Sequence, residues 1–494
     1  MTRLNKMLFS RFASGMKAAL GAGAALYLLV YMGVAVARLA YPFELEWMEG
    51  GSLVQMRRIL DGKPLYAPPT IEFVPYIYPP LYFYGAALIS CVTGFGFVPL
   101  RIVSFAASLG CFGLIFLIVK RETGAWFAGV MASGLFAATF ELSGAWFDLA
   151  RVDSLCLLLT LAGLYWARWA DSRIHFARTG LCFALAWFTK QTALLIALPC
   201  MAYSVFAKRR RALWLLGAFA LLTAGGMLML DAAHHGWVRY YLLTVPRRHA
   251  LLPKMAIVFW AQDMLRPLAI AFCCGLWHLG SRWSEGRAFW LAAGIGMIGG
   301  AWMSRMHSGG YFNVLLPAHA FVAIMFGLAF HYIEQQSRQA ETTPYSRIFL
   351  YAVCCLQFIG LLYDPAQYIP SKNDQQAGRQ LVERLAQIKG EVFIPRHGYL
   401  ALLAGKPAFA QEMAVFDVMR GDAAFQHRSI SAQLRQDMQE AVAKQRFAAI
   451  ITDYATTEFE PHYQMNQTIF RDAHLFQPVT GIETRPEFIY VPRR

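Results

Sequence analysis

Apolar segments long enough to cross a membrane dominate the chain, since a spanning helix needs about 20 mostly apolar residues. Only 15% of the 494 residues are charged and 57% are hydrophobic, which excludes a water-soluble or disordered protein. We therefore predict an α-helical polytopic membrane protein with about 11 transmembrane helices. The predicted spans are 18–40, 101–119, 124–141, 153–169, 177–189, 191–207, 212–231, 264–281, 288–304, 311–331 and 347–363.

One further apolar run, 79–97, decides the topology. If it spanned, the basic clusters Lys120-Arg121 and Lys208–Arg211 would face away from the cytoplasm, against the positive-inside rule. The run opens with Pro79-Pro80 and is rich in glycine and aromatic residues, which is typical of an interfacial helix. We predict eleven spans with the N-terminus inside, and keep twelve spans as the alternative.

The segment 365–494 differs in character from residues 1–364. It holds 15 basic and 14 acidic residues, against 30 and 16 in the first 364, so the net charge of +15 comes almost entirely from the first part. We predict a transmembrane domain over 1–364, with a first outer loop at 41–100, and a small soluble α/β domain over 365–494. In the second part the patterns predict helices at 374–388 and 429–444, and strands at 391–395, 448–452 and 488–491.

All nine cysteines lie in apolar stretches, and none forms a CxxC pair. Cysteine in a membrane helix is usually a small apolar filler, so a disulfide framework is not expected. The pair His234-His235 lacks the further ligands that a metal site needs. The sequence therefore predicts no metal-ligating residues, and the basic excess indicates membrane orientation rather than nucleic-acid binding.

Three carboxylates, Glu44, Glu46 and Glu49, follow the first span directly, beside the interfacial anchor Trp47. Glu46 and Glu49 are three residues apart, so a helix starting here would place them on one face. An acid against apolar surroundings is costly unless it binds something, which favours a general base at the membrane surface. The alternative is a solvated helix start whose acids offset the helix dipole.

Isolated polar and charged residues mark the other outer loops. Such groups can hold a phosphate, or can simply form ion pairs and snorkel to the interface. Carboxylates and cations on one face of the membrane, beside apolar helices, suit a substrate with a charged head and a lipid tail. The residues concerned are Arg151 and Asp153 at the start of one span, Lys190 between two spans, and Arg305 with Gly309-Gly310 and Asn313.

In this order the motifs resemble the GT-C superfamily of integral-membrane glycosyltransferases, over roughly residues 15–330. The nearest resemblance is to bacterial proteins with an RgtA/B/C/D-like domain, and a more distant one is to protein O-mannosyltransferases and aminoarabinose transferases. It is carried by Glu46–Gly50, Gly62-Lys63-Pro64-Leu65-Tyr66, Tyr78-Pro79-Pro80, Gly96 with Arg101, Arg151-x-Asp153, Thr189-Lys190-Gln191 and Gly309-Gly310-x-x-Asn313.

The resemblance implies an inverting transfer of a hexosyl or pentosyl group from a polyprenyl-phosphate donor to a glycan, lipid or protein acceptor. By family analogy, Glu49 or Glu46 acts as the base. A divalent cation stays open as a cofactor, and no nucleic-acid partner is expected. The implied location is the bacterial inner membrane, among its lipids, with 365–494 in the periplasm. The implied phosphate-binding or site-organising residues are Arg101, Arg151, Asp153, Lys190, Arg305 and Asn313, and those of the acceptor or loop are Lys63, Tyr66 and Tyr78.

Two other functions fit parts of the pattern. A transporter or flippase for lipid-linked sugars would place charges deep within its spans and show repeated halves, whereas here the charges lie at span ends and no repeat is evident. A non-catalytic scaffold would display 365–494 but would not need three carboxylates in the first outer loop.

Overall fold

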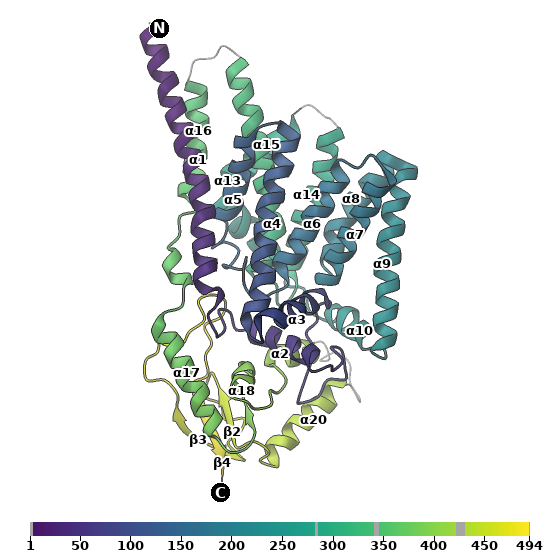
Figure 1. Cartoon of the computed structure of the whole chain (residues 1–494), viewed down its shortest axis with the longest axis vertical. Helices are drawn as coiled ribbons and strands as arrows, with labels where there is room; N and C mark the ends of the chain where they lie inside the picture. The colour runs from purple at the N-terminus through teal and green to yellow at the C-terminus, as the bar shows by residue number, and fades with distance from the viewer. Residues whose placement is uncertain (1–2, 282–284, 340–344, 421–429, 494) are drawn as a thin grey trace.

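A helical bundle carries a smaller α/β region at one end of the molecule (Figure 1). The computed structural model describes residues 3–281, 285–339, 345–420 and 430–493. The two chain ends lie at opposite ends of the long axis, with the N-terminus on the bundle and the C-terminus on the α/β region.

Within the described residues, eleven bundle helices coincide with the eleven predicted spans. Five helical stretches are long and apolar enough to cross a membrane, and three others are shorter apolar helices. The prediction of an α-helical polytopic membrane protein is confirmed. The helices are α1 (Arg3–Leu39), α4 (Phe97–Thr123), α5 (Trp126–Ala138), α6 (Asp153–Arg168), α7 (Arg173–Thr189), α8 (Ala193–Lys208), α9 (Ala212–Ala233), α13 (Arg266–Gly280), α14 (Glu285–Met306), α15 (Leu316–Gln339) and α16 (Tyr345–Ile359).

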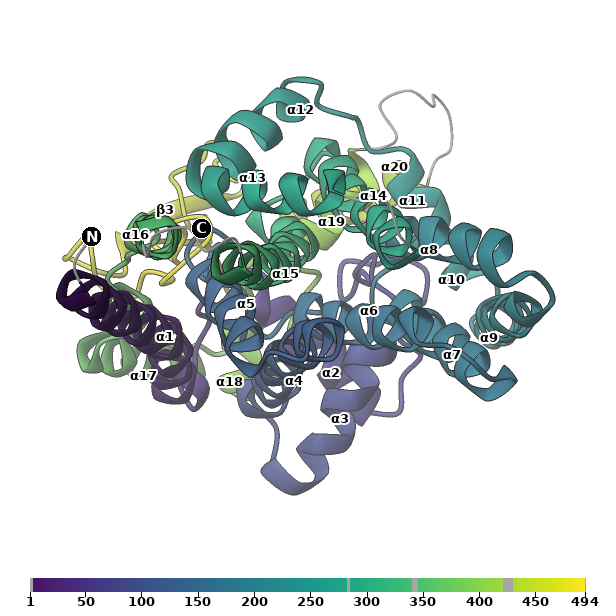
Figure 2. The same cartoon turned by 90° about the horizontal axis from the view of Figure 1, so that it is seen from above.

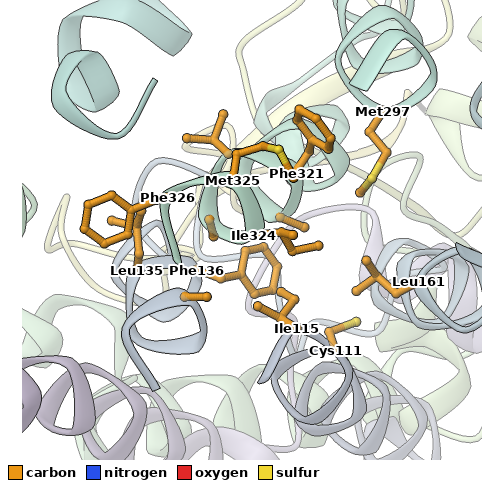
Figure 3. Close-up of a cluster of buried hydrophobic side chains, with 14 of the residues drawn as sticks. Cys111, Ile115, Leu135, Phe136, Leu161, Met297, Phe321, Ile324, Met325 and Phe326 are labelled. Atoms are coloured by element: carbon orange, nitrogen blue, oxygen red, sulfur yellow. The ribbon is translucent and has the colours of Figure 1, made fainter. Parts of the chain in front are cut away.

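Helix α15 forms the centre of the bundle, since 89% of its most apolar window is buried. Its side chains pack against those of α4, α5, α6 and α14, and Figure 3 shows this cluster. Because α15 is covered on all sides, its sequence is apolar around its circumference rather than along one stripe. The labelled residues are Cys111, Ile115, Leu135, Phe136, Leu161, Met297, Phe321, Ile324, Met325 and Phe326.

The run 79–97 does not cross the bundle. It forms α3 (Leu81–Thr93), which lies across the bundle axis beside α2 (Glu49–Leu60), at the end that faces the α/β region. Figure 2, viewed from above, shows α3 from its side while α4 and α15 are seen nearly end-on. Leu88 and Val92 on α3 are 73% and 90% exposed. This orientation agrees with the interfacial prediction and not with twelve spans.

Short helical turns connect α9 to α13 and α14 to α15. Two of them have π-type hydrogen bonding, which often occurs at functional positions. They are α10 (Trp237–Arg239), η2 (Tyr240–Thr244), α11 (Val245–Arg247), α12 (Lys254–Val258) and η3 (Phe259–Leu265), with η4 (Phe312–Leu315) before α15. A 3-10 turn, η1 (Arg209–Arg211), separates α8 from α9.

The C-terminal region contains a four-stranded sheet in the order β1-β2-β4-β3. Strands β1 and β2 are parallel, with Val392 opposite Ala449, while β4 is antiparallel to both β2 and β3. The predicted helices and the three predicted strands are present. The elements are η5 (Pro365–Tyr368), α17 (Lys372–Gln387), β1 (Val392–Phe393), α18 (Tyr399–Leu403), α19 (Glu412–Met419), α20 (Ile430–Ala443), β2 (Ala449–Thr452), β3 (Tyr463–Thr468) and β4 (Phe488–Pro492).

The C-terminal region and the outer loop 41–100 share one hydrophobic core. The rings of Phe43 and Phe476 lie 5.1 Å apart between centroids, and those of Phe97 and Tyr399 lie 5.3 Å apart. Burial of aromatic surface from both parts fixes the C-terminal region over the loop that carries the three glutamates.

Candidate functional site

Glu49, the first residue of α2, forms a fully buried ion pair with Arg101 of α4. Arg101 Nη2 donates to Glu49 Oε2 at 2.6 Å, and Arg101 Nε donates to Oε1 at 3.2 Å. Both side chains are 0% exposed. The backbone amides of Ala150 and Leu45 donate to the same carboxylate at 2.6 and 2.7 Å. Glu49 therefore ties together the first outer loop, α4 and the segment before Arg151.

This environment keeps Glu49 ionised. Burial by itself raises the pKa of Glu49, but the charge of Arg101 and the four hydrogen bonds outweigh it and hold the pKa below its usual value. Arg101 also donates to the carbonyl groups of Tyr41 and Phe43, each at 2.6 Å. Both side chains are engaged by protein groups and organise the loop around them.

Glu46 lies in a different environment, although it is only three residues away. It is 1% exposed, and among the described residues its Oε2 has no hydrogen-bond partner. Burial raises the pKa of Glu46 to about 8, against the opposing effect of Arg151. A carboxylate that is destabilised in this way is a stronger base once it loses its proton.

Arg151, just before α6, faces Glu46. Its Nη1 is 3.6 Å from Glu46 Oε2, and this nitrogen likewise has no hydrogen-bond partner among the described residues. Its Nη2 donates to the Tyr78 hydroxyl at 3.1 Å. The guanidinium lies 5.6 Å from the ring centroids of both Tyr78 and Trp146. The arginine is therefore held in place while one of its donors stays free for a ligand.

Lys190 and Asn313 converge on Asp153, the first residue of α6. Lys190 Nζ and Asn313 Nδ2 donate to Asp153 Oδ1 at 2.6 and 2.9 Å. Asp153 Oδ2 is buried and has no hydrogen-bond partner within the described chain. Next to Lys190, Gln191 donates to the Ile77 carbonyl at 2.7 Å, which joins this group to the Tyr78 segment.

The other predicted site residues lie farther out. Arg305 donates to Asp263 and to the Gly310 carbonyl, each at 2.8 Å, so it stabilises the glycine turn after α14. Tyr66 is buried, and its hydroxyl donates to the Tyr78 carbonyl at 2.6 Å. Lys63 is 61% exposed at its side chain and lies 3.8 Å from Asp61, outside the cluster.

A buried histidine that the sequence analysis did not single out joins the C-terminal region to the first outer loop. His397 Nδ1 is 2.5 Å from Glu44 Oε2, and its Nε2 is 3.1 Å from Asp453 Oδ2. Burial lowers the pKa of His397, but the two carboxylates outweigh burial and raise it to about 10. Glu44 in turn accepts from the Gly50 amide at 2.9 Å. The positions are 353 residues apart, so no local pattern indicates this contact.

A second junction missed from the sequence involves α19. Arg420 donates to His249 Nδ1 at 2.7 Å and lies 2.5 Å from Asp417 Oδ1. It also donates to the Ser308 hydroxyl at 3.3 Å. The C-terminal region thus contacts the glycine turn after α14 as well as the first outer loop.

No group of three or more His, Cys, Asp or Glu side chains within the described residues could hold a metal ion. Asp153 is paired with Lys190, and Glu49 with Arg101, so these carboxylates are balanced by cationic side chains.

The comparisons with known proteins agree with this architecture. Residues 78–237 match the family model described as dolichyl-phosphate-mannose-protein mannosyltransferase. The crystal structure of ArnT from Cupriavidus metallidurans in the apo state aligns with a TM-score of 0.62 at 12% identity, over 94% of this chain and 97% of that one. The chain has the same fold as ArnT. The resemblance found in the sequence is therefore confirmed.

Two further structures have the same fold. ArnT from Cupriavidus metallidurans bound to undecaprenyl phosphate aligns with a TM-score of 0.61 at 11% identity, over 95% of this chain and 97% of that one. The archaeal oligosaccharyltransferase AglB from Archaeoglobus fulgidus, in complex with an inhibitory peptide and a dolichol-phosphate, gives a TM-score of 0.53 at 13% identity, over 87% and 69% of the two chains. No curated protein sequence matches this chain at a significant level.

Proposed function

We propose that this protein is a membrane glycosyltransferase that moves a sugar from a polyprenyl-phosphate donor to an acceptor with inversion. The match to mannosyltransferases and the similarity to ArnT bound to undecaprenyl phosphate and AglB bound to dolichol-phosphate support a donor of this class. The observation that carries the proposal is the facing pair of Glu46 and Arg151, each with one buried polar atom that no described residue satisfies.

In the proposed reaction, Glu46 removes the proton from an acceptor hydroxyl. The acceptor oxygen then forms a bond to the anomeric carbon of the donor sugar from the face opposite the phosphate. The bond between this carbon and the phosphate oxygen breaks, and the polyprenyl phosphate leaves with the electron pair. Glu46 keeps the proton until it is released to solvent.

The leaving phosphate gains negative charge, and cations that are already in place stabilise it without reorganisation. Arg151 supplies its free Nη1, and Lys190 lies near the same Tyr78 hydroxyl to which Arg151 donates. Asp153 and Asn313 fix Lys190, while Glu49, Arg101 and Arg305 hold the surrounding loops. We assign Tyr66 and Tyr78 to the same support and Lys63 to the outer rim.

We further propose that the reaction occurs at the periplasmic side of a bacterial inner membrane, and that residues 365–494 form the outer domain of a transmembrane domain made of 1–364. The basic clusters at the bundle end away from Glu46 support this orientation. In this proposal the transferred sugar is a hexosyl or pentosyl group. The acceptor is a glycan, a lipid or a protein.

The test uses the full-length protein purified in detergent. Mass spectrometry of lipid extracted from the preparation is expected to show a polyprenyl phosphate or its sugar conjugate. Incubation with a bacterial lipid extract and a cell-envelope fraction is expected to release free polyprenyl phosphate. Glu46→Gln should abolish this release. Glu391→Gln should not, because Glu391 is a partly exposed carboxylate that is paired with Arg446, away from the cluster. Release that persists in Glu46→Gln contradicts the assigned base.

A further inference from the structure

A cavity of about 650 Å³ lies in the C-terminal region, separate from the Glu46 and Arg151 cluster. Its size is in the range of sites for small ligands. It is lined by apolar and aromatic side chains together with polar groups, of which Arg396, Glu412 and Asp453 form one wall. The apolar lining comes from the outer loop, β1, α19, α20 and the segment between β2 and β3, and includes Ile71, Phe393, Phe416, Met438, Val442 and Phe459.

The polar wall lies where the two parallel strands end. Arg396 follows β1 and Asp453 follows β2, and both line the cavity together with Glu412. In open α/β sheets, ligands bind outside the carboxyl ends of the parallel strands. Arg396 Nε lies 3.0 and 3.1 Å from the two carboxylate oxygens of Glu412, which fixes the wall in one arrangement.

The same wall contacts the loop that carries Glu46. Asp453 binds His397, which binds Glu44, two residues before Glu46. Arg396 lies 5.8 Å from the ring centroid of Trp47, the residue next to Glu46. The polar wall of the cavity is therefore connected to the loop that carries the proposed base, through hydrogen bonds to His397 and Glu44 and through the contact of Arg396 with Trp47.

We propose that this cavity binds the sugar rings of a glycan acceptor and directs one of its hydroxyl groups toward Glu46. This inference rests on the proposed function and adds the acceptor class. Aromatic side chains such as Phe416, Phe459 and Tyr454 can pack against the apolar faces of sugar rings. Carboxylates accept about four hydrogen bonds each, and the contacts recorded for Asp453 among the described residues fall on Oδ2. Its other oxygen and Glu458 can accept hydrogen bonds from ligand hydroxyls.

The position of the cavity favours a glycan over the acyl chain of a lipid. Helix α20 and strand β2, which line it, lie at the end of the molecule away from the helical bundle (Figure 1). An acyl chain would have to leave the hydrocarbon layer to reach this cavity, and the CH₂ groups between the membrane and the cavity would be exposed to water. A hydrated glycan reaches it without this exposure.

The experiment measures binding of four trisaccharides, mannotriose, isomaltotriose, chitotriose and galactotriose, to the full-length protein in detergent by saturation-transfer NMR. A serine-rich decapeptide and a short-chain phosphatidylglycerol serve as the competing classes. Met438→Trp fills the cavity and is expected to weaken trisaccharide binding about tenfold or more. Gln433→Trp, exposed on the same helix, is the matched control and is expected to leave binding unchanged. Val442→Phe, a second cavity-filling variant, is used if Met438→Trp does not fold.

Trisaccharide binding that is lost in the cavity-filling variant and kept in the control supports the proposal. Failure of every trisaccharide to bind, binding of the peptide or phosphatidylglycerol instead, or binding that Met438→Trp leaves intact overturns it. Retention of undecaprenyl phosphate by each preparation, measured by mass spectrometry, separates these outcomes from a failure of the proposed function. Glu46→Gln is expected to keep trisaccharide binding, because the cavity does not include Glu46.

Discussion

Two glutamates three residues apart in one loop differ in what surrounds their carboxylates. Glu49 accepts four hydrogen bonds and pairs with Arg101, so its pKa is low and it binds protein groups only. Glu46 is equally buried, but its pKa is raised to about 8 and it faces Arg151 across 3.6 Å. Burial with full pairing gives a structural ion pair, whereas burial with incomplete pairing gives a reactive base.

The pH dependence of transfer is expected to follow Glu46. A base acts in its ionised form, so the rate at low substrate concentration should rise as the pH passes through about 8. Initial rates of polyprenyl phosphate release, measured from about pH 5.5 to 9.5, test this pH dependence, because the range extends to both sides of the expected inflection. Glu391→Gln should keep the inflection. An unchanged inflection in residual activity of Glu46→Gln would show that another group titrates.

Replacement of Glu49 is expected to lower the stability of the folded protein, and not only its transfer activity. Glu49→Gln leaves the charge of Arg101 buried without its counter-ion, which typically costs about 3–5 kcal/mol. Thermal unfolding in detergent should show a clear fall in the melting temperature. Glu46→Gln is the matched control and should melt closer to the wild type, because the pKa of Glu46 is raised to about 8, so that near neutral pH the substitution replaces a mostly uncharged side chain. Equal melting temperatures for wild type and Glu49→Gln would contradict the structural role.

At the scale of elements, periodicity and hydropathy predicted the helices and strands whose formation depends on residues close together in the sequence. The span 124–141 is α5 (Trp126–Ala138), and the strand 448–452 is β2 (Ala449–Thr452). Strand β3 (Tyr463–Thr468) was missed because it is an edge strand whose residues after Tyr463 are exposed and, apart from Met465, polar. The contact of His397 with Glu44 was missed because tertiary packing creates it.

His397 is expected to hold the C-terminal region on the first outer loop. His397→Gln leaves Glu44 and Asp453 buried without the cation between them, which is expected to lower stability by about 3–5 kcal/mol. The raised pKa of His397 means that its stabilising effect is complete below the unfolded-state value of about 6.5. This effect is lost as the pH rises through about 10. Melting temperatures at about pH 6, 8 and 10.5 test this, because these values lie below, between and above the unfolded and folded pKa values of His397.

The wild type should lose its advantage over His397→Gln at the highest pH. The exposed His474 provides the control, since His474→Gln should follow the wild type throughout. A constant difference between wild type and His397→Gln across the three pH values would contradict the assigned ion pairing.

At the scale of the whole molecule, charge and position agree on one orientation. Helix α8 begins three residues after Lys190 and extends over 16 residues, or about 24 Å, to the basic turn at Arg209–Arg211. Helix α2, which begins three residues after the proposed base, lies with the C-terminal region at the other end of the bundle, beside α3 (Figure 1). From the positive-inside rule we propose that the turn lies in the cytoplasm and α20 outside.

This orientation predicts opposite labelling of two introduced cysteines. Gln433→Cys on α20 and Arg210→Cys in the basic turn both replace exposed side chains. In intact spheroplasts a membrane-impermeant maleimide should label Gln433→Cys, and should label Arg210→Cys only after permeabilisation. Cys91 and Cys273 are the exposed native thiols among the described residues, so both are replaced by serine in the background, and this background without an introduced cysteine is the blank. Labelling of both positions on one side of the membrane would contradict an odd number of crossings between them, and with it the placement of Glu46 on the outer face.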